Sequence, residues 1–371
     1  MAKISIIITC YNVEEYVSTA IQSVIDCGFD DLELIVVDDG STDKTRHLVD
    51  LILRDAPSGI TFEPIYSTVN TIGGVACAAN IGLEKATGDI VVFVDGDDWV
   101  IPHNLREAVS LLEHSHADFV VCDCREYGNN NGKYSQYPEH YQWHLLHGIR
   151  AREEQRKILL RMAPFPWRKV YRREFLESNN IRFPIGPFFF EDNPFHWETT
   201  IRAEKFVFLE KVTHVHRMDR AGQTVASKGA KYLKIFDHAD IIRKMLEDRG
   251  EMQTYRIPYI NWLLRHILWC SKWTLNELQN QVYTLSVEHL RRLNEEEFNK
   301  GIQTERFKMS DVRLLTTLFQ DEKFEYLREI RDSDESTAKS RSKIENGYSK
   351  EVSAPRKLDQ IFCYKPHTSA N

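Results

Sequence analysis

The sequence lacks the features that define several common classes of protein. No run of 18 or more apolar residues is present, so we expect no membrane-spanning helix. The first residues, MAKISIIITCYN, have no secretory cleavage pattern and are expected to form a first strand. No GxGxxG or GxxxxGKS/T motif follows an expected strand, which argues against a dinucleotide-binding fold and a P-loop. With a net charge of −7, the chain also lacks the broad positive field of a nucleic-acid-binding protein, so we expect no nucleic-acid partner.

Cysteines are few, and their spacing suggests no pairing. The seven cysteines are odd in number and scattered, and none belongs to a CxxC motif. Cys122 and Cys124 would share one face of a strand, but no second Cys or His pair completes a metal site. We therefore expect reduced thiols in a cytoplasmic protein, with any membrane contact peripheral and at the inner face of the cell membrane.

The sequence does contain a regular alternation of strand-like and helix-like patterns from residue 3 to about 125. The strand-like runs are KISIIITC, LELIVVDD, ITFEPIYS, DIVVFVD and DFVVCDC, and the helical patterns lie near 13–26, 42–54, 74–86 and 102–115. This alternation predicts an α/β fold with a mostly parallel sheet and helices on both faces. Ligands of such folds bind beyond the carboxyl ends of the strands.

Composition divides the chain into three parts. Residues 1–225 hold the alternating units and a less regular, aromatic-rich stretch, and we expect them to form the first domain. Residues 226–331 have apolar residues three and four apart, which predicts a helical C-terminal region. Residues 332–371 begin with a long polar stretch of mixed charge, which predicts a disordered tail.

The end of the fourth predicted strand carries Asp95, Asp97 and Asp98 within four positions. Like charges this close raise one another's pKa unless a cation neutralises them, and oxygen ligands suit Mg²⁺ or Mn²⁺. Because Mg²⁺ takes few protein carboxylates, Asp95 and Asp97 would form half of a site that a diphosphate completes. The alternative is a turn and a helix start, with Asp98 capping the helix near residue 102.

Two other strand ends carry candidate ligand-binding side chains. Asp38 and Asp39 close the second strand. A turn at this position does not require two adjacent aspartates. A site that accepts a hydrogen bond from a nucleobase N–H does require a carboxylate there. Tyr11, after the first strand, is either a core aromatic or a ring that stacks on a base.

The motifs ITCYN, VVDDGSTD and VFVDGDDWVIP, in this order and spacing, resemble those of the family 2 glycosyltransferases. The resemblance covers about residues 3–220, and NTIGGVACAANIGLEKATGD is similar to the family's helix that leads into the acidic strand. It implies an inverting enzyme of the GT-A fold, with a Rossmann-like, mostly parallel sheet followed by a helical C-terminal region.

The resemblance further implies a donor site for a nucleotide sugar, most often a UDP-sugar. Thr9 and Tyr11 would flank the base, and Asp39 would accept a hydrogen bond from it. Asp95 would face the ribose or a metal-bound water. Asp97 would bind the Mn²⁺ or Mg²⁺ ion that bridges the diphosphate.

Later motifs resemble the acceptor side of the family's site. FFFEDNPFHWE is similar to the family's Glu-Asp motif, which implies Asp192 as general base and Glu191 as a residue that orients the acceptor. The alternative is an N-cap at Asp192 with Glu191 on the surface. FPWRKVYRREF is similar to a family pattern of Trp, Lys and Tyr-Arg-Arg, which implies that Trp167 shapes the acceptor pocket, with a core tryptophan as the alternative.

HVHRMDRAGQT resembles the loop that closes over the diphosphate in this family. His216 would reach the metal, and Arg217 or Arg220 would reach the phosphates. An ordinary surface histidine is the alternative. The family often has Arg-Asn where this chain has Ala79-Asn80, so Arg217 or Lys169 would have to replace that diphosphate contact.

The expected reaction is the transfer of one sugar to a hydroxyl of a glycan or a lipid-linked oligosaccharide, in the synthesis of cell-surface polysaccharide. Processive synthases of the family usually add a QxxRW motif and membrane helices, and the sequence has neither. Tryptophans at positions 262, 269 and 273 of the helical region form either an amphipathic surface for the membrane or part of the core.

Two other functions compete with this hypothesis. A sugar-phosphate nucleotidyltransferase shares the doubly wound sheet and carboxylate-bound Mg²⁺, but it would need a glycine-rich, basic loop where this chain has TCYNVEEY. A catalytically silent binding or scaffold protein could retain the same fold. Measurable hydrolysis of the donor would exclude the silent protein.

Overall fold

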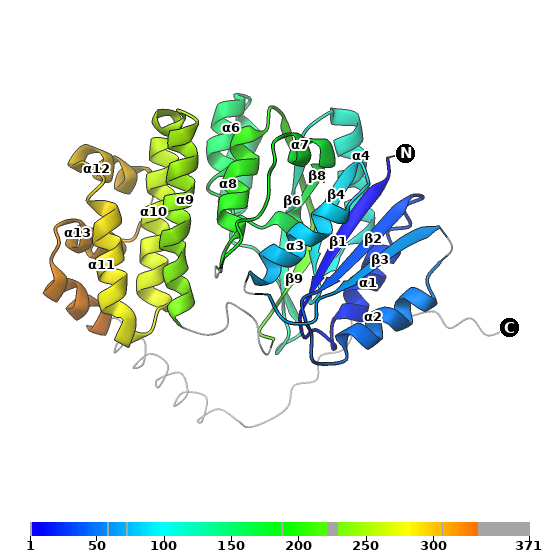
Figure 1. The fold of residues 1–371 in the computed structure, drawn as a ribbon. Helices are drawn as coiled ribbons and strands as arrows, with labels where there is room; N and C mark the ends of the chain where they lie inside the picture. Colours follow the sequence, from blue (N-terminus) through cyan, green and yellow to red (C-terminus); the bar gives the residue numbers. More distant parts are fainter. Residues whose placement is uncertain are drawn as a thin grey trace, which may run out of the picture.

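The computed structural model describes residues 2–57, 59–71, 73–186, 189–220, 229–305 and 307–332. An α/β part built on one large sheet lies beside a helical part formed by the later residues (Figure 1). The predicted domain boundary near residue 225 and the predicted tail beyond residue 332 fall outside the described residues.

Within the described residues, the sheet has nine strands in the order β3-β2-β1-β4-β8-β6-β9-β5, with β7 paired to β6. The strand bounds are β1 Ile4–Cys10, β2 Leu32–Asp38, β3 Ile60–Tyr66, β4 Ile90–Asp95, β5 Trp99–Val100, β6 Phe119–Gly128, β7 Lys133–Gln136, β8 Lys169–Arg172 and β9 Phe206–Met218. Strands β1 to β4 are parallel to one another. Strand β8 is antiparallel to both β4 and β6, so β6 has the same direction as β4. Strand β9 is parallel to β6. The predicted mostly parallel sheet is confirmed, and the short strands β5, β7 and β8 run in the opposite direction.

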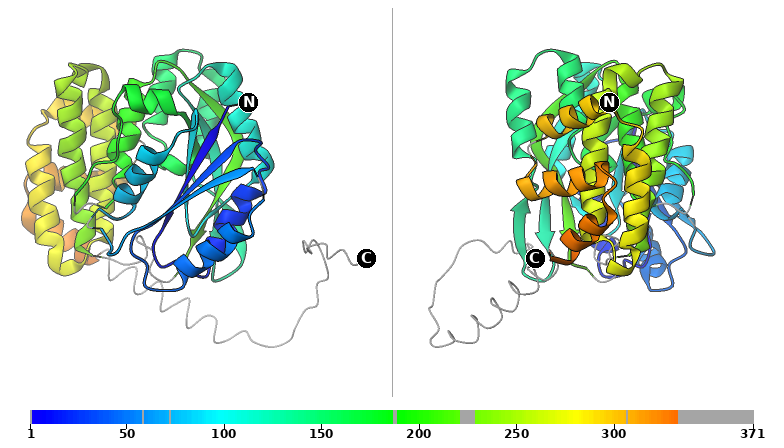
Figure 2. Two further views of the ribbon diagram at one scale, coloured as in Figure 1. Left: turned by 45° about the vertical axis from the view of Figure 1, so that its right-hand side comes forward. Right: turned by 90° about the vertical axis from the view of Figure 1, so that its left-hand side faces the viewer.

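Helices cover both faces of this sheet (Figure 2), as the nearly unbroken Ile and Val runs of its central strands require. Alternate residues of β1 point to opposite faces: Ile6 and Ile8 join one core cluster, and Ile7 joins the other. The first face carries α1 Val17–Ile25, α2 Thr45–Arg54 and α4 Pro102–Ser115. The second carries α3 Gly74–Lys85, α5 His140–Gly148, α6 Arg152–Leu159, α7 Arg173–Ser178 and α8 Asp192–Arg202.

The carboxyl ends of β1, β2 and β4 meet at one edge of the sheet. Thr9 of β1 is in register with Asp95 of β4 on one side and Val37 of β2 on the other. Cys10 is in register with Asp38. The register therefore brings together the strand ends that the sequence marks as polar.

The predicted helical region is also present. It contains η3 Ala230–Leu233, α9 Lys234–Asp248, α10 Met252–Trp273, η4 Asn276–Leu278, α11 Gln279–Leu290, α12 Glu295–Thr304 and α13 Met309–Phe319, followed by a helix over 323–332. Its core cluster includes Trp197 and Ile201 of α8, so the two parts of the molecule share apolar packing. Figure 1 shows α8 between the sheet and α9.

The tryptophans of this region are mostly core residues. Trp262 is buried within the helical core cluster, and Trp269 packs against it, whereas Trp273 is 47% exposed. The prediction of an amphipathic membrane-facing surface is therefore wrong for Trp262 and Trp269, because their rings fill the space between helices. Among the described residues, none of the helices combines the length and the apolar character needed to cross a bilayer.

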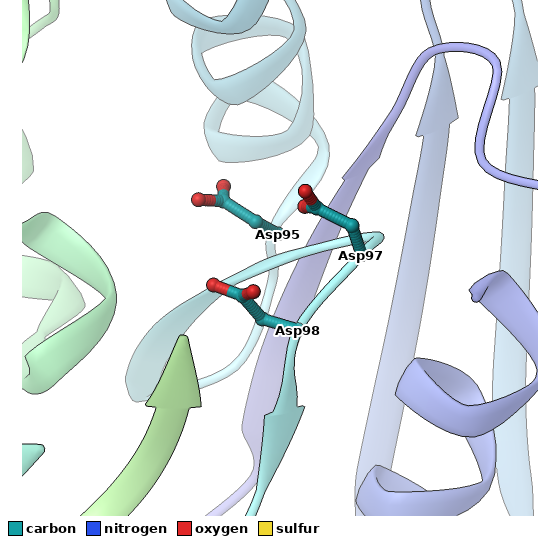
Figure 3. A group of neighbouring side chains, drawn as sticks. All are labelled: Asp95, Asp97 and Asp98. Carbon is teal, nitrogen blue, oxygen red and sulfur yellow. The ribbon is translucent and has the colours of Figure 1, made fainter. Parts of the chain in front are cut away.

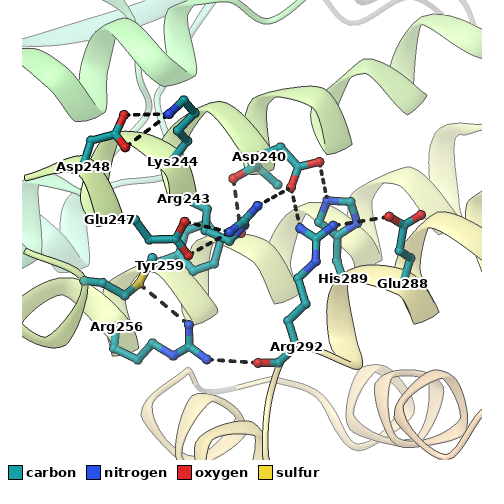
Figure 4. A network of polar contacts seen from close by, with 12 residues as sticks. Asp240, Arg243, Lys244, Glu247, Asp248, Arg256, Tyr259, Glu288, His289 and Arg292 are labelled. Atoms are coloured by element: carbon teal, nitrogen blue, oxygen red, sulfur yellow. Dashed lines mark hydrogen bonds and ion pairs between the residues drawn. The ribbon is translucent and has the colours of Figure 1, made fainter. Parts of the chain in front are cut away.

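Ion pairs link the outer faces of the C-terminal helices (Figure 4). Asp240 of α9 pairs with Arg292, which follows α11, and with His289 at 3.6 Å. Arg256 of α10 pairs with Glu297 of α12 at 2.8 Å. Exposed pairs of this kind each contribute about 1 kcal/mol or less, so the apolar cluster beneath them carries most of the packing energy.

The close approach of α3 to β1 gives a testable prediction. A Cβ at Gly82 would lie 2.3 Å from Ile7 Cγ2, whereas a Cβ at Gly148, the last residue of α5, would meet nothing within 4 Å. We expect Gly82→Ala to lower the free energy of unfolding by about 1–3 kcal/mol through overpacking. Gly148→Ala should change it by no more than about 1 kcal/mol. Urea unfolding of the two variants measures the difference, and equal midpoints would contradict the packing.

Candidate active site

The loops that follow β1 and β2 are joined by hydrogen bonds. Asn12, with φ of 50°, donates its backbone N–H to Ser41 Oγ at 2.8 Å and accepts from the Thr42 N–H at 2.8 Å. Val13 N–H donates to Thr45 Oγ1 at 2.9 Å. Beside these contacts Tyr11 is 45% exposed, so its interpretation as a core aromatic is wrong. An exposed ring at a strand end remains available for stacking on a base.

Asp38 and Asp39 both make contacts within the protein. Asp38 Oδ1 accepts from Arg46 Nε at 2.7 Å and from the Ser41 N–H at 3.0 Å. The buried Asp39 carboxylate accepts from Asn70 Nδ2 and from the Thr71 N–H, each at 3.0 Å. Burial raises the pKa of Asp39, while the hydrogen bonds from Thr71 oppose the rise. These contacts fix the 70–71 loop, and contact of Asp39 with a nucleobase stays a prediction.

Three carboxylates gather around the turn that follows β4 (Figure 3). Asp95, Asp97 and Asp98 each offer an oxygen, and these oxygens lie within 4.8 Å of one another. Burial raises the pKa of Asp95 to about 8, and the charges of Asp98 and Asp97 add to the rise. Thr9 Oγ1 donates to Asp95 Oδ1 at 3.3 Å. Within the cluster, burial and the two neighbouring carboxylates thus disfavour the ionised form of Asp95.

Asp98 joins the turn to strand β9. Its Oδ1 accepts from the Arg217 N–H at 2.7 Å, and its Oδ2 contacts His216 Nδ1 at 2.8 Å. Burial acts to lower the pKa of His216, but the charges of Asp98, Asp97 and Asp95 outweigh burial and raise it to about 9. The expected capping role of Asp98 is wrong, because α4 begins at Pro102 with Ile101 at its N-cap.

Arg217 and Arg220 both contact the acidic turn. The Arg217 guanidinium lies among the rings of Tyr16, Trp99 and Tyr127, at 4.6, 4.8 and 5.6 Å from their centroids. Its Nε donates to the Asp97 carbonyl at 2.8 Å. Arg220 Nε forms an ion pair with the Asp97 carboxylate. Contact of either arginine with phosphate stays a prediction, and Arg217 would have to exchange protein contacts to make it.

The donor set at this turn fits a divalent cation. Asp98 uses both oxygens on His216 and the Arg217 N–H, and Asp97 uses one oxygen on Arg220. Asp95 and the other oxygen of Asp97 are therefore the carboxylate groups most suited to bind a metal. All-oxygen ligands suit Mg²⁺ and Mn²⁺. His216, whose Nδ1 is held by Asp98, has the carboxylate-supported geometry typical of metal-binding histidines. The metal ligand roles stay predictions.

A second acidic pair, Glu191 and Asp192, lies at the start of α8. Glu191 occupies the N-cap position and Asp192 is the first helical residue, so the alternative with Asp192 as N-cap is wrong. Burial raises the pKa of Asp192 to about 6, against hydrogen bonds from Asn193 and the charge of Lys169. Burial raises the pKa of Glu191 to about 7, and the charge of Asp192 adds to the rise, while a hydrogen bond from the Ala76 backbone opposes it.

Lys169 and Trp167 lie beneath the surface. Lys169 is fully buried, and its Nζ contacts His196 Nδ1 at 2.6 Å, so its expected role as a replacement phosphate ligand is wrong. Trp167 is 5% exposed and stacks on Phe165 and His216, with centroid distances of 4.5 and 5.7 Å. The Trp167 ring thus belongs to the core cluster on that face, and its role in shaping an acceptor pocket stays a prediction.

Sequence reasoning missed Asn193, whose amide contacts Asp192. Asn193 Nδ2 lies 3.1 Å from Asp192 Oδ1. An amide directly after a candidate base, in the first turn of a helix, was the available signal. Its long-range partner Trp262 could not be found from local sequence, because 69 residues separate the two.

The fold and the acidic edge of the sheet define a class of protein, the GT-A fold. Residues 5–179 match the family model of Glycosyl transferase family 2, so this region of the chain is similar to that family. The solved structure of Staphylococcus aureus TarS 1-349 in complex with UDP-GlcNAc has a TM-score of 0.66 and 21% identity, covering 90% of this chain and 92% of that one. This likeness concerns the fold.

Two curated relatives illustrate the sequence similarity. Uncharacterized glycosyltransferase EpsJ of Bacillus subtilis is 29% identical over 217 residues, which cover 58% of this chain and 60% of EpsJ. Poly(ribitol-phosphate) beta-N-acetylglucosaminyltransferase TarS of Staphylococcus aureus is 25% identical over 245 residues, covering 66% of this chain and 40% of TarS. The chain therefore spans less than two thirds of the length of these relatives.

The acidic turn predicts a site that binds a divalent cation, and substitution of one carboxylate should weaken that binding. We expect Asp97→Asn to weaken Mn²⁺ binding at least about tenfold, or ~1.4 kcal/mol, because it deletes a charge from the donor set. Titration calorimetry with Mn²⁺, with and without UDP, measures the affinity. Asp31→Asn, the same change at an exposed residue just before β2, is the matched control. Equal Mn²⁺ affinity in both variants would contradict the site.

Proposed function

We propose that the protein is a metal-dependent inverting glycosyltransferase. It moves one sugar from a nucleotide sugar, a UDP-sugar, to a hydroxyl of a glycan or a lipid-linked oligosaccharide in cell-surface polysaccharide synthesis. The observation that carries this proposal is the presence of two separate acidic groups with different surroundings. One is the cluster of three carboxylates after β4, and the other is the partly buried pair at the start of α8.

The first group suits the donor. Asp95 and Asp97 would hold the divalent cation, with His216 as a further ligand held by Asp98. When bound, the cation would neutralise charge on the departing diphosphate. Arg220 already lies against Asp97 and can exchange that carboxylate for a phosphate oxygen.

The identity of the donor is inferred from the nucleoside side and from structural neighbours. Thr9, Tyr11 and Asp39 lie at the ends of β1 and β2, where a base and ribose would bind. Solved structures of Staphylococcus aureus TarS are complexes with UDP-GlcNAc and with UDP, which supports a UDP-sugar for this chain. The name of one relative, poly(ribitol-phosphate) beta-N-acetylglucosaminyltransferase TarS, supports a polymeric acceptor.

The second group suits the acceptor. Asp192 would remove the proton from the acceptor hydroxyl as its oxygen forms the new bond to the anomeric carbon, while the bond from that carbon to the diphosphate breaks. With a pKa of about 6, most of the Asp192 carboxylate is ionised at neutral pH yet still basic enough to take a proton. Glu191 would orient the acceptor. One displacement inverts the configuration at carbon, and no covalent intermediate on the protein is required.

Asp192→Asn separates binding from turnover. We expect the substitution to reduce kcat by roughly 10² to 10⁴, the usual range for loss of an acid–base group. Stabilisation by UDP with Mn²⁺ in thermal unfolding should persist, because the donor groups are intact. Release of UDP from a UDP-sugar, with and without added acceptor, measures turnover, and Asp31→Asn again serves as the control. A silent scaffold protein would release no UDP in any variant.

The pH dependence of the reaction should report the same carboxylate. Burial raises the pKa of Asp192 to about 6, so the base is protonated below that pH and ionised above it. We expect kcat/KM to fall about tenfold per unit as the pH drops below about 6 and to level off above it. A profile that stays flat down to pH 4.5 would rule out a buried carboxylate as the base.

A further inference from the structure

The helical region holds the short segment that carries the acidic pair. Phe190 has a φ of 66°, a left-handed conformation that is unfavourable for a bulky residue. Its ring stacks on Tyr232 of η3 and meets Trp269 of α10 edge-on, with centroid distances of 5.5 and 4.7 Å. His238 Nε2 of α9 contacts the Phe189 carbonyl oxygen at 2.6 Å. Three elements of the helical region thus maintain this backbone just before Glu191.

Asn193 connects this segment to the candidate base. Its Oδ1 accepts from Trp262 Nε1 of α10 at 2.9 Å. Its Nδ2 donates to the Phe190 carbonyl at 3.0 Å and to Asp192 Oδ1 at 3.1 Å. Two donor hydrogens and one acceptor oxygen of the amide are therefore in use.

The partners of Asn193 allow only one orientation of its amide. An indole N–H can only donate, so the Asn193 oxygen must face Trp262, and the NH₂ group must then face Asp192. Asn193 is 4% exposed and Trp262 is 3% exposed, so water competes little for these bonds. Leaving either group unpaired in such a site would be costly, which favours the connected arrangement.

We propose that Trp262 and Asn193 are positioning residues, through which helix α10 aims the Asp192 carboxylate at the acceptor hydroxyl. The inference rests on the proposed role of Asp192 as the base. It extends that role, because it makes the helical region a working part of the active site. The hydrogen bonds from Asn193 also lower the pKa of Asp192 against the effect of burial, so they favour the ionised base.

The test uses single substitutions that remove each link. Trp262→Phe keeps an aromatic ring but deletes the N–H, and Asn193→Ala deletes the amide. We expect each to lower kcat by about tenfold or more, with the KM for the UDP-sugar unchanged. Asn193→Ala removes a hydrogen bond to the Asp192 carboxylate, and Trp262→Phe leaves the buried Asn193 oxygen unpaired. The acid limb of kcat/KM should move to higher pH, most clearly in Asn193→Ala.

A matched control separates positioning from core damage. Trp197→Phe makes the same truncation in the same core cluster, and Trp197 Nε1 has no hydrogen-bond partner among the described residues. We expect this control to lower the unfolding midpoint about as much as Trp262→Phe does, while leaving the pH limb in place. Equal kinetic effects of the two tryptophan substitutions would overturn the proposal.

The double variant tests whether Trp262 acts through Asn193. If it does, adding Trp262→Phe to Asn193→Ala should change kcat and the pH limb no further, whereas independent effects would multiply and overturn the relay. Asp192→Asn in the same assay keeps the two hypotheses apart. If that variant stays active, the proposed base is wrong, and if it is inactive while Trp262→Phe behaves as the control does, only the positioning role is wrong.

Discussion

The architecture of the acidic edge depends on keeping three carboxylates together at the end of one strand. Strand β9 and the residues after it, far away in the sequence, compensate the charges of two of them. Asp98 contacts His216 and the backbone of Arg217, and Asp97 pairs with Arg220. Among the described residues, Asp95 alone of the three has no basic side chain as a hydrogen-bond partner, and it accepts from Thr9 instead. The long strand β9 is therefore required by charge as well as by packing.

The first half of the fold follows closely from local sequence. Strands such as IVVFVD are apolar enough to be buried on both faces, and amphipathic or apolar helical patterns separate them. The parallel direction of β1 to β4 is therefore predictable from the sequence. Strands β5 and β8 are not predictable from the sequence, because their segments WV and KVYR are too short to show an alternation of apolar and polar residues. Their formation depends on partners from distant parts of the chain.

The candidate site was predictable to a similar depth. Residue types at strand ends mark Tyr11 and the acidic cluster, because turns and ligand sites use recognisable chemistry. The environment of a side chain is set by tertiary packing instead, which is why local sequence does not reveal that Lys169, a candidate diphosphate contact, is buried against His196. The same reason separates Trp262, a buried hydrogen-bond donor, from Trp273, a half-exposed ring.

The hydrogen bonds between the loops after β1 and β2 have a thermodynamic consequence. Asn12 of one loop is hydrogen-bonded to Ser41 and Thr42 of the other, so these loops lose conformational freedom when the chain folds. Ordering a side chain at the moment of binding costs about 0.5–1.5 kcal/mol, and a preformed wall removes part of that cost from each encounter. A nucleoside that binds here would therefore meet a rigid surface, and its selectivity would come from shape more than from adaptation.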